Sequence, residues 1–200
     1  MYTLINCSPK LESSNSLKFL DIISKELDNY VFFSINKDSR EDIISNIYKS
    51  DVIVFALPLY VDAPPSKLLE FFDYIIDNNI KFESKLVYFV INCGFREAEQ
   101  NVTALNIIKN WCKKVNLKYC SSILIGAGEV VGNKKFRFIS KKFLKDIENF
   151  ATFIKEKKET EEFFTTVDYI NNNIYCYFAN MFWNRNAKHN KLSISDIKKE

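Results

Sequence analysis

Hydroxyl side chains crowd one short stretch near the start of the chain, "CSPKLESSNS" at residues 7–16. The side chains that carry a hydroxyl or an amide there are Ser8, Ser13, Ser14, Asn15 and Ser16. A helical pattern begins near residue 15, and the start of a helix offers unpaired N–H groups that hold an anion. Ser14 or Asn15 alone would also serve as an ordinary helix cap. The stretch by itself therefore leaves two interpretations open, a capped turn and a phosphate site.

The absence of the common nucleotide-binding motifs from this stretch indicates which phosphate group it would bind. Neither GxxxxGK[ST] nor GxGxxG follows the first apolar run, so the stretch is neither of the two common glycine-rich nucleotide loops. Hydroxyls and backbone amides without a lysine cradle favour a monophosphate over a triphosphate.

Two later stretches are suited to a flat ligand. In "ALPLYVDAPPSKLLEFFD" (56–73), a stiff apolar turn at residues 58–61 precedes two prolines that favour a helix start. Taken alone, this turn is as well explained by packing on its own helix. In "INCGFREAEQ" (91–100), Gly94 permits close approach of the backbone, and residues 92–95 could lend N–H groups to a heterocycle.

The elements that must position these stretches alternate along the chain. Short, nearly continuous apolar runs predict buried parallel strands at 2–6, 30–35, 51–57, 86–92 and 121–127. Apolar residues at helical spacing separate them: Leu17, Leu20, Ile23 and Leu27; Leu68, Phe71, Phe72 and Ile75; Val102, Leu105, Ile108 and Cys112; Phe143, Ile147, Phe150 and Ile154. This alternation predicts a doubly wound, five-stranded parallel α/β sheet. Ligands of such sheets bind at the carboxyl ends of the strands, so the three stretches together predict a site for a mononucleotide such as FMN.

These stretches resemble the loops of a known family, the flavodoxin-like NAD(P)H-dependent FMN oxidoreductases that include FMN reductases and quinone reductases. "INCSPKLESSNS" resembles the family's phosphate loop, and "PLYVDAPPSKLLEFFD" resembles its Pro-x-Tyr loop beside the isoalloxazine ring. "INCGFREAEQN" and "GAGEVVG" (126–132) resemble its third and fourth loops, and "YCYFANMFWNRNAKHN" resembles a tail found in some members.

The resemblance implies a cofactor and a role for each matching residue. Ser8, Lys10, Ser14, Asn15 and Ser16 would hold the FMN phosphate; Pro58, Leu59, Tyr60 and Val61 would flank the ring; Asn92, Cys93, Gly94 and Phe95 would contact its polar edge. Backbone amides of residues 93–95 are the expected donors to that edge. The implied activity passes hydride from NAD(P)H through FMN to a small-molecule acceptor such as a quinone or a flavin, and the flavin supplies the redox chemistry with no catalytic side chain.

Two alternatives remain beside this enzyme. The first is a flavodoxin-type electron carrier without hydride chemistry; such carriers are usually strongly acidic, and the net charge of +3 argues against one. The second is a flavodoxin-fold protein that has lost FMN, because Cys7 stands where the family usually has glycine. A Cβ at that position is expected to crowd the phosphate or shift the loop.

The composition of the chain disfavours several other classes of protein. The small net charge disfavours nucleic acid as a partner, and the Phe and Ile positions of "KKFRFISKKFLK" (134–145) fit a helix with its lysines in water. No run of about 18 uncharged apolar residues predicts a transmembrane helix, and no secretory signal is visible at the start. Five unclustered cysteines and one histidine predict neither a metal site nor an iron–sulfur cluster, and fit reduced thiols in the cytoplasm.

The predicted organisation is a flavodoxin-like domain over residues 1–157 and a C-terminal helical extension over 158–200 that packs on the same domain. Residues 158–165 form a charged connector, and a further helical pattern follows it. Its apolar side carries Val167, Ile170, Ile174, Tyr177, Phe178 and Met181. Packing on the domain, a lid over the site and a dimer surface are all compatible with this aromatic helix, and we expect a homodimer.

Overall fold

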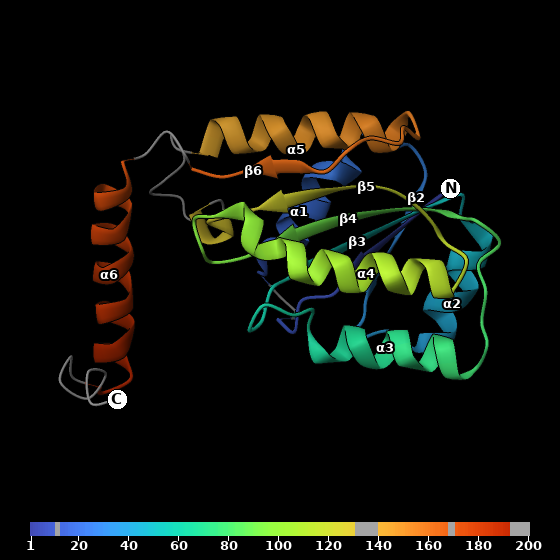
Figure 1. The fold of residues 1–200 in the computed structure, drawn as a ribbon, viewed down its shortest axis with the longest axis horizontal. Coiled ribbons are helices and arrows are strands. Elements are labelled where there is room, and N and C mark those ends of the chain that lie inside the picture. Colours follow the sequence, from blue (N-terminus) through green and yellow to red (C-terminus); the bar gives the residue numbers. More distant parts are fainter. Residues whose placement is uncertain (11–12, 131–139, 168–170, 193–200) are drawn as a thin grey trace. The chain divides into compact units, whose positions relative to one another are not determined.

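The computed structural model describes residues 1–10, 13–130, 140–167 and 171–192. The chain divides into two compact units, Met1–Thr166 and Val167–Glu200. The first unit contains the whole sheet with five helices around it, and the second contains the last helix (Figure 1).

The sheet has six parallel strands in the order β2-β1-β3-β4-β5-β6. The strands are β1 (Tyr2–Asn6), β2 (Tyr30–Ser34), β3 (Val52–Pro58), β4 (Leu86–Asn92), β5 (Lys118–Ile125) and β6 (Phe163–Thr165). The five strands predicted from the apolar runs are confirmed, as is the doubly wound order. β2 is not buried as predicted, because it lies at the edge of the sheet, where none of its residues is fully covered. Because β2 lies on one side of β1 while β3, β4 and β5 follow on the other, the strand order reverses between β1 and β3. A doubly wound sheet binds its ligand at such a reversal.

The sequence pattern does not predict the sixth strand, because its three residues lie within the charged stretch 158–165. β6 pairs with β5 over three residues, from Ile123↔Phe163 to Ile125↔Thr165. The Phe163 ring packs against the rings of Phe150 and Phe153, with centroids 5.7 and 5.1 Å away. Tertiary packing therefore holds this short strand, and the sheet runs past residue 157, where the sequence predicted the domain to end.

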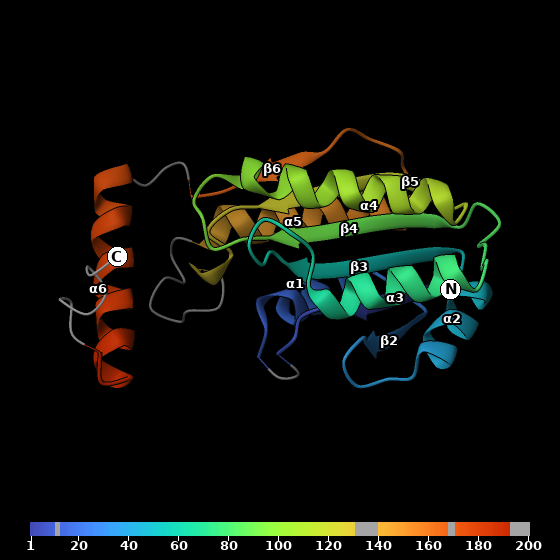
Figure 2. The same cartoon turned by 60° about the horizontal axis from the view of Figure 1, so that its bottom comes forward.

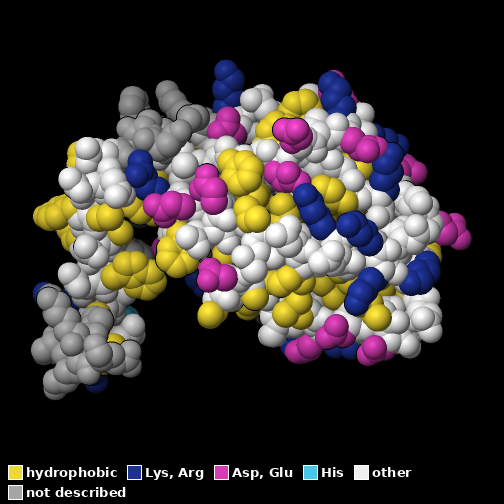
Figure 3. Space-filling model, viewed as in Figure 1, with side chains coloured by type: hydrophobic (Ala, Val, Ile, Leu, Met, Phe, Trp, Pro, Cys, Tyr) yellow, Lys and Arg dark blue, Asp and Glu magenta, His cyan; other side chains and the backbone are white. Residues whose placement is uncertain are grey.

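Helices cover both faces of the sheet (Figures 1 and 2). On the face of the first unit that Figure 3 shows, Lys and Arg side chains lie among Asp and Glu side chains. The helices of the first unit are α1 (Asn15–Ser24), α2 (Arg40–Lys49), α3 (Ser66–Asp77), α4 (Val102–Lys114) and α5 (Ser140–Lys155). α2, α3 and α4 pack on one face in a core that takes Ile53, Phe55 and Leu57 from β3. The alternate β3 residues, Val54 among them, face the other side, where α1 and α5 lie next to each other.

The predicted helix faces are largely confirmed, and one residue is corrected. Val102 was expected on the buried face of α4 but is 37% exposed, because it begins the helix directly after a short 3₁₀ turn at Ala98–Asn101. Leu105, Ile108 and Cys112 are buried as predicted, and Trp111 joins them by stacking on Phe72, with ring centroids 3.8 Å apart.

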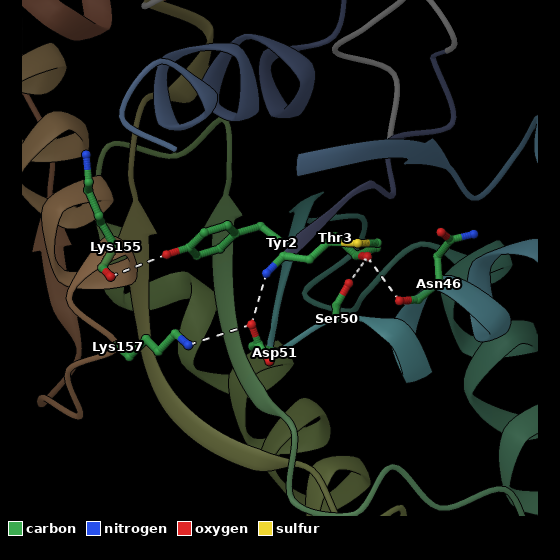
Figure 4. Close-up of polar contacts among 8 residues, drawn as sticks. Tyr2, Thr3, Asn46, Ser50, Asp51, Lys155 and Lys157 are labelled. Carbon is green, nitrogen blue, oxygen red and sulfur yellow. Dashed lines mark hydrogen bonds and ion pairs between the residues drawn. The ribbon is translucent and has the colours of Figure 1, made fainter. Parts of the chain in front are cut away.

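Polar contacts join residues at the amino ends of β1 and β3 (Figure 4). This end of the sheet is opposite the carboxyl ends of the strands, where the ligand is expected. The N-terminal ammonium group lies 2.9 Å from the Asp51 carboxylate, and Lys157 lies 3.8 Å from the same carboxylate. The hydroxyls of Thr3 and Ser50 are hydrogen-bonded at 2.5 Å and are buried. The hydrogen bond from the ammonium group lowers the pKa of Asp51, but the exposure of this carboxylate keeps the pair's contribution to stability small.

The second unit contains α6 (Asn172–His189). The side chain of Asn171 caps it by accepting a hydrogen bond of 2.9 Å from the N–H of Asn173. Ile174, Tyr177 and Met181 of the predicted apolar pattern lie within this helix, whereas Ile170 is outside the described residues. In the described part of the chain, no helix combines the length and the apolar character needed to cross a bilayer. Packing of the extension on the domain remains a prediction.

Candidate functional site

A pocket of about 150 Å³ lies at the carboxyl ends of β1, β3 and β4, where the strand order reverses. Its lining residues are Ser8, Lys10, Ser13, Ser14, Asn15, Ser16, Pro58, Leu59, Tyr60, Asn92, Cys93, Gly94 and Glu129. The three predicted loops therefore meet at one pocket, and every predicted site residue except Val61 and Phe95 lines it. The sequence interpretation had not assigned Ser13 or Glu129 to the site.

The loop after β1 is built from short side-chain-to-backbone bonds. The Asn6 side chain accepts from the N–H of Ser8 at 3.1 Å, and the Ser8 hydroxyl accepts from the N–H of Lys10 at 3.3 Å. From the loop after β2, the Asn36 side chain donates to the Ser8 carbonyl at 2.8 Å. These bonds place Ser8 at the pocket wall, and Asn6 and Asn36 are supporting residues that no sequence motif revealed.

Helix α1 begins at this pocket with a side-chain cap. The Ser14 hydroxyl accepts a hydrogen bond of 3.1 Å from the N–H of Leu17, so the capping interpretation is confirmed for Ser14. The N–H groups of Asn15 and Ser16 belong to the first helical turn, which has no intrahelical acceptor for them. Within the described residues, neither group has another acceptor. The start of α1 thus combines an ordinary cap with two open donors and a positive dipole end.

Three of the four serine hydroxyls at the pocket accept hydrogen bonds from other groups of the protein. Ser8 accepts from Lys10, Ser14 accepts from Leu17, and the Ser16 hydroxyl accepts from the Asn92 side chain at 3.1 Å. A hydroxyl that accepts still carries its own hydrogen. These three hydroxyls and the two N–H groups belong to residues of one pocket, and each retains a hydrogen that it can donate, a set that suits a phosphate group.

Cys7 was predicted to crowd this loop, and the structure corrects that expectation. The N–H of Cys7 donates to the carbonyl of Ala56 at 2.8 Å, which continues the pairing of β1 with β3. Its side chain is fully buried in the core shared with Ile5 and Leu57, and it is not part of the pocket lining. Burial raises the pKa of the Cys7 thiol, so this group is an inert core side chain.

The loop after β3 ends in a tight turn with an unusual backbone. Tyr60 and Ala63 bond each other twice through their backbones, at 2.9 and 3.0 Å. The two residues between them, Val61 and Asp62, have φ values of 48° and 58°. Two central residues at positive φ define a type I′ turn, which normally takes Asn and Gly. A β-branched residue in this conformation is strained, and Val61 is 99% exposed at the tip.

The loop after β4 leaves open space beside Gly94. A Cβ atom built on Gly94 would have nothing within 4 Å, and the neighbouring Phe95 is 58% exposed. The N–H of Cys93, however, donates to the carbonyl of Ile125 at 3.0 Å. The prediction that this amide serves as a donor to a ligand is therefore wrong, because a strand-end hydrogen bond uses it. Burial also raises the pKa of the Cys93 thiol.

The loop after β5 contacts the loop after β4 through its backbone. A Cβ on Gly126 would lie 2.1 Å from the Arg96 carbonyl oxygen, so only glycine fits there. The N–H of Gly128 donates to the Cys93 carbonyl at 2.9 Å, and Glu129 follows at the pocket wall. The remainder of the predicted fourth loop, residues 131–132, lies outside the described residues.

The described residues contain no cluster of three or more His, Cys, Asp or Glu side chains arranged to hold a metal ion. The pocket's charged side chains are Lys10 and Glu129. The pocket therefore combines neutral hydrogen-bond donors with these two charged side chains, and it has open space beside Gly94 and an apolar rim at residues 58–60.

Comparison with known proteins supports the fold. No family model matches the sequence, and no curated protein sequence matches it. Solved structures do match: an NADPH-quinone reductase from P. pentosaceus has a TM-score of 0.60 at 16% identity, over 76% of this chain and 97% of that one. An FMN-dependent NADH-azoreductase from Bacillus anthracis, solved in complex with FMN, has a TM-score of 0.57 at 14% identity, over 76% and 97%. A flavodoxin from Streptococcus pneumonia TIGR4 has a TM-score of 0.58 at 12% identity, over 78% and 99%.

These matches confirm that the first unit has the flavodoxin-like fold predicted from the loops. Their identity is too low to carry more than the fold. They include two reductases and a flavodoxin, so what this chain does must be argued from its own site.

Proposed function

We propose that this protein is an FMN-dependent oxidoreductase that passes hydride from NAD(P)H to a small-molecule acceptor such as a quinone or a flavin. The observation that carries the proposal is the convergence of three serine hydroxyls and two helix N–H groups on one pocket. In the flavodoxin-like fold this pocket lies at the strand reversal, where ligands of doubly wound sheets bind.

The residues present fit FMN. Ser8, Ser14 and Ser16 with the first turn of α1 would hold the phosphate, with Lys10 adding positive charge. The pocket volume of about 150 Å³ is below the few hundred Å³ that enclose a whole ligand of this size. The pocket would therefore take the phosphate end, and the ring would lie along the open rim, where Tyr60, Phe95 and the space beside Gly94 are accessible.

When bound, FMN supplies the redox chemistry that no side chain of this pocket provides. The protein's part is to bind and orient. Fixed backbone dipoles near the ring stabilise negative charge that develops there, and with the Cys93 amide engaged, the N–H of Phe95 is the donor that we propose from the predicted set. Among the described residues of the first unit, Tyr60 and Phe95 of this rim are exposed, and we propose that NAD(P)H and then the acceptor approach there.

The alternatives differ in measurable ways. A flavodoxin-type carrier would bind FMN without accepting hydride from NAD(P)H, whereas a protein that has lost the cofactor would not bind FMN at all. The buried position of Cys7 removes the main argument for that loss.

The test is to add FMN to the purified protein, remove the excess by desalting, and record the absorbance spectrum. Retained flavin absorbance that NADH or NADPH bleaches in a stopped-flow experiment supports the oxidoreductase. Retained flavin that neither nucleotide bleaches supports the carrier, and no retained flavin refutes the proposal. A homodimer and a cytoplasmic location remain predictions, for which the molecular mass in solution and cell fractionation are the tests.

A further inference from the structure

Asn92 lies at the end of β4 and bonds to two other segments of the site. Its side-chain nitrogen donates to the Leu57 carbonyl of β3 at 2.8 Å and to the Ser16 hydroxyl of α1 at 3.1 Å. Its backbone carbonyl accepts from the N–H of Leu59 at 2.7 Å. Asn92 is 4% exposed and Ser16 is 1% exposed, so the bond between their side chains is shielded from water.

The orientation of the Asn92 amide follows from its partners. The Leu57 carbonyl can only accept, so the atom facing it must be the amide nitrogen. One hydrogen of that nitrogen goes to Leu57 and the other goes to Ser16. Both amide hydrogens are therefore used within the protein, and the Ser16 oxygen is fixed as an acceptor.

From this geometry we infer that Asn92 is a positioning residue for the phosphate group of the flavin, rather than a contact of the ring edge as its loop had predicted. By occupying a lone pair of the Ser16 oxygen, Asn92 directs the hydroxyl hydrogen of Ser16 away from itself and leaves it to donate to the phosphate. The inference rests on the proposed function and deepens it, because it makes the preference for a phosphorylated flavin depend on a residue outside the phosphate loop.

Gly128 provides a second way to perturb the same residue. A Cβ on Gly128 would lie 3.1 Å from the Asn92 side-chain oxygen and 3.2 Å from its Cβ, closer than ordinary contact. We therefore expect Gly128→Ala to move the Asn92 side chain by a few tenths of an ångström without removing its amide group.

The experiment compares the binding of FMN and of riboflavin, which lacks the phosphate, by quenching of flavin fluorescence. The variants are Asn92→Ala, Ser16→Ala, the double variant and Gly128→Ala. Asn46→Ala is the matched control, because its side chain also donates to a carbonyl, that of Asp42 at 2.9 Å, but lies in α2 near the amino ends of the strands (Figure 4).

We expect Asn92→Ala to raise the Kd for FMN about tenfold, which matches the loss of one hydrogen bond to a charged group, with the Kd for riboflavin changed less than about twofold. Ser16→Ala is expected to give the same pattern, and the double variant to be no weaker than Ser16→Ala alone. The control should leave both constants unchanged.

If Asn92→Ala lost the same affinity for FMN and for riboflavin, the inference would be overturned, because Asn92 would then act on the ring and not on the phosphate. Additive losses in the double variant would overturn it as well. If Asn92→Ala fails to fold by circular dichroism, Gly128→Ala decides: a loss confined to FMN supports the role, and an equal loss or no loss refutes it. If the unchanged protein binds neither flavin, the proposed function itself fails and this role fails with it.

Discussion

The strained turn at the tip of the β3 loop yields a quantitative prediction. Val61 has a φ of 48°, a conformation that costs an ordinary L-residue about 1–2 kcal/mol and that asparagine tolerates better. Because Val61 is 99% exposed, replacing it removes almost no packing. We therefore expect Val61→Asn to increase the free energy of unfolding by about 1 kcal/mol, which corresponds to about 2–4 °C in Tm for a chain of this size.

The assay is thermal and urea unfolding of the purified protein, followed by circular dichroism. Val61→Ala is the matched control, since it also removes the exposed side chain but leaves a residue that disfavours positive φ. An unchanged or lowered Tm in Val61→Asn, or an equal gain in Val61→Ala, would refute the assignment of strain to this backbone. Backbone strain persists in proteins where it serves a site, so we also expect Val61→Asn to bind FMN more weakly.

Three further predictions concern the support of the site and the sheet. Gly126→Ala should lower the free energy of unfolding by at least about 3 kcal/mol in urea titrations, because its Cβ would collide with the backbone carbonyl of Arg96. Gly94→Ala should leave stability within about 1 kcal/mol, since its Cβ meets open space, but should weaken FMN binding measured by fluorescence. The hydrogen bond from Lys109 lowers the pKa of Glu162, so the stability from this pair is present above the ordinary glutamate pKa and is lost as the pH falls through the lowered value. Glu162→Gln should therefore show a smaller drop in unfolding free energy between pH 7 and pH about 3 than the unchanged protein.

The sequence predicted the central strands because each of them is a nearly continuous apolar run, as expected for a strand covered on both faces. The edge strand β2 has a similar apolar run although none of its residues is buried. The loops were predictable for the same reason, since the ends of those runs mark the carboxyl edge. β6 was not predicted because three residues carry too little pattern. Their pairing with β5 and the packing of Phe163 on α5 hold them as a strand, and neither contact is visible in the sequence. Cys7 lies two residues after Ile5, so both side chains point to the same face of the sheet and both are buried there. This alternation is visible in the sequence, but the resemblance to family loops with glycine at this position favoured a different interpretation.

The finer assignments within the site depended on contacts between distant segments. Asn92 and Cys93 lie in the predicted loop, but a sequence cannot show that Ser16 and Leu57 use the Asn92 amide or that Ile125 uses the Cys93 N–H. Glu129 lines the pocket for a similar reason, because the neighbouring Gly128 N–H bonds to the Cys93 carbonyl and holds the loop after β5 against the loop after β4. Residue types thus predicted where the site lies, and tertiary hydrogen bonds decided which groups are available in it.

The central claim is that the serine-rich start of α1 is a phosphate cradle for FMN. The most direct measurement is the Kd of the unchanged protein for FMN and for riboflavin under the same buffer conditions. Convergent donors to a charged phosphate predict that FMN binds at least about tenfold more tightly than riboflavin. Equal affinities for the two flavins, or no binding of FMN, would contradict the account.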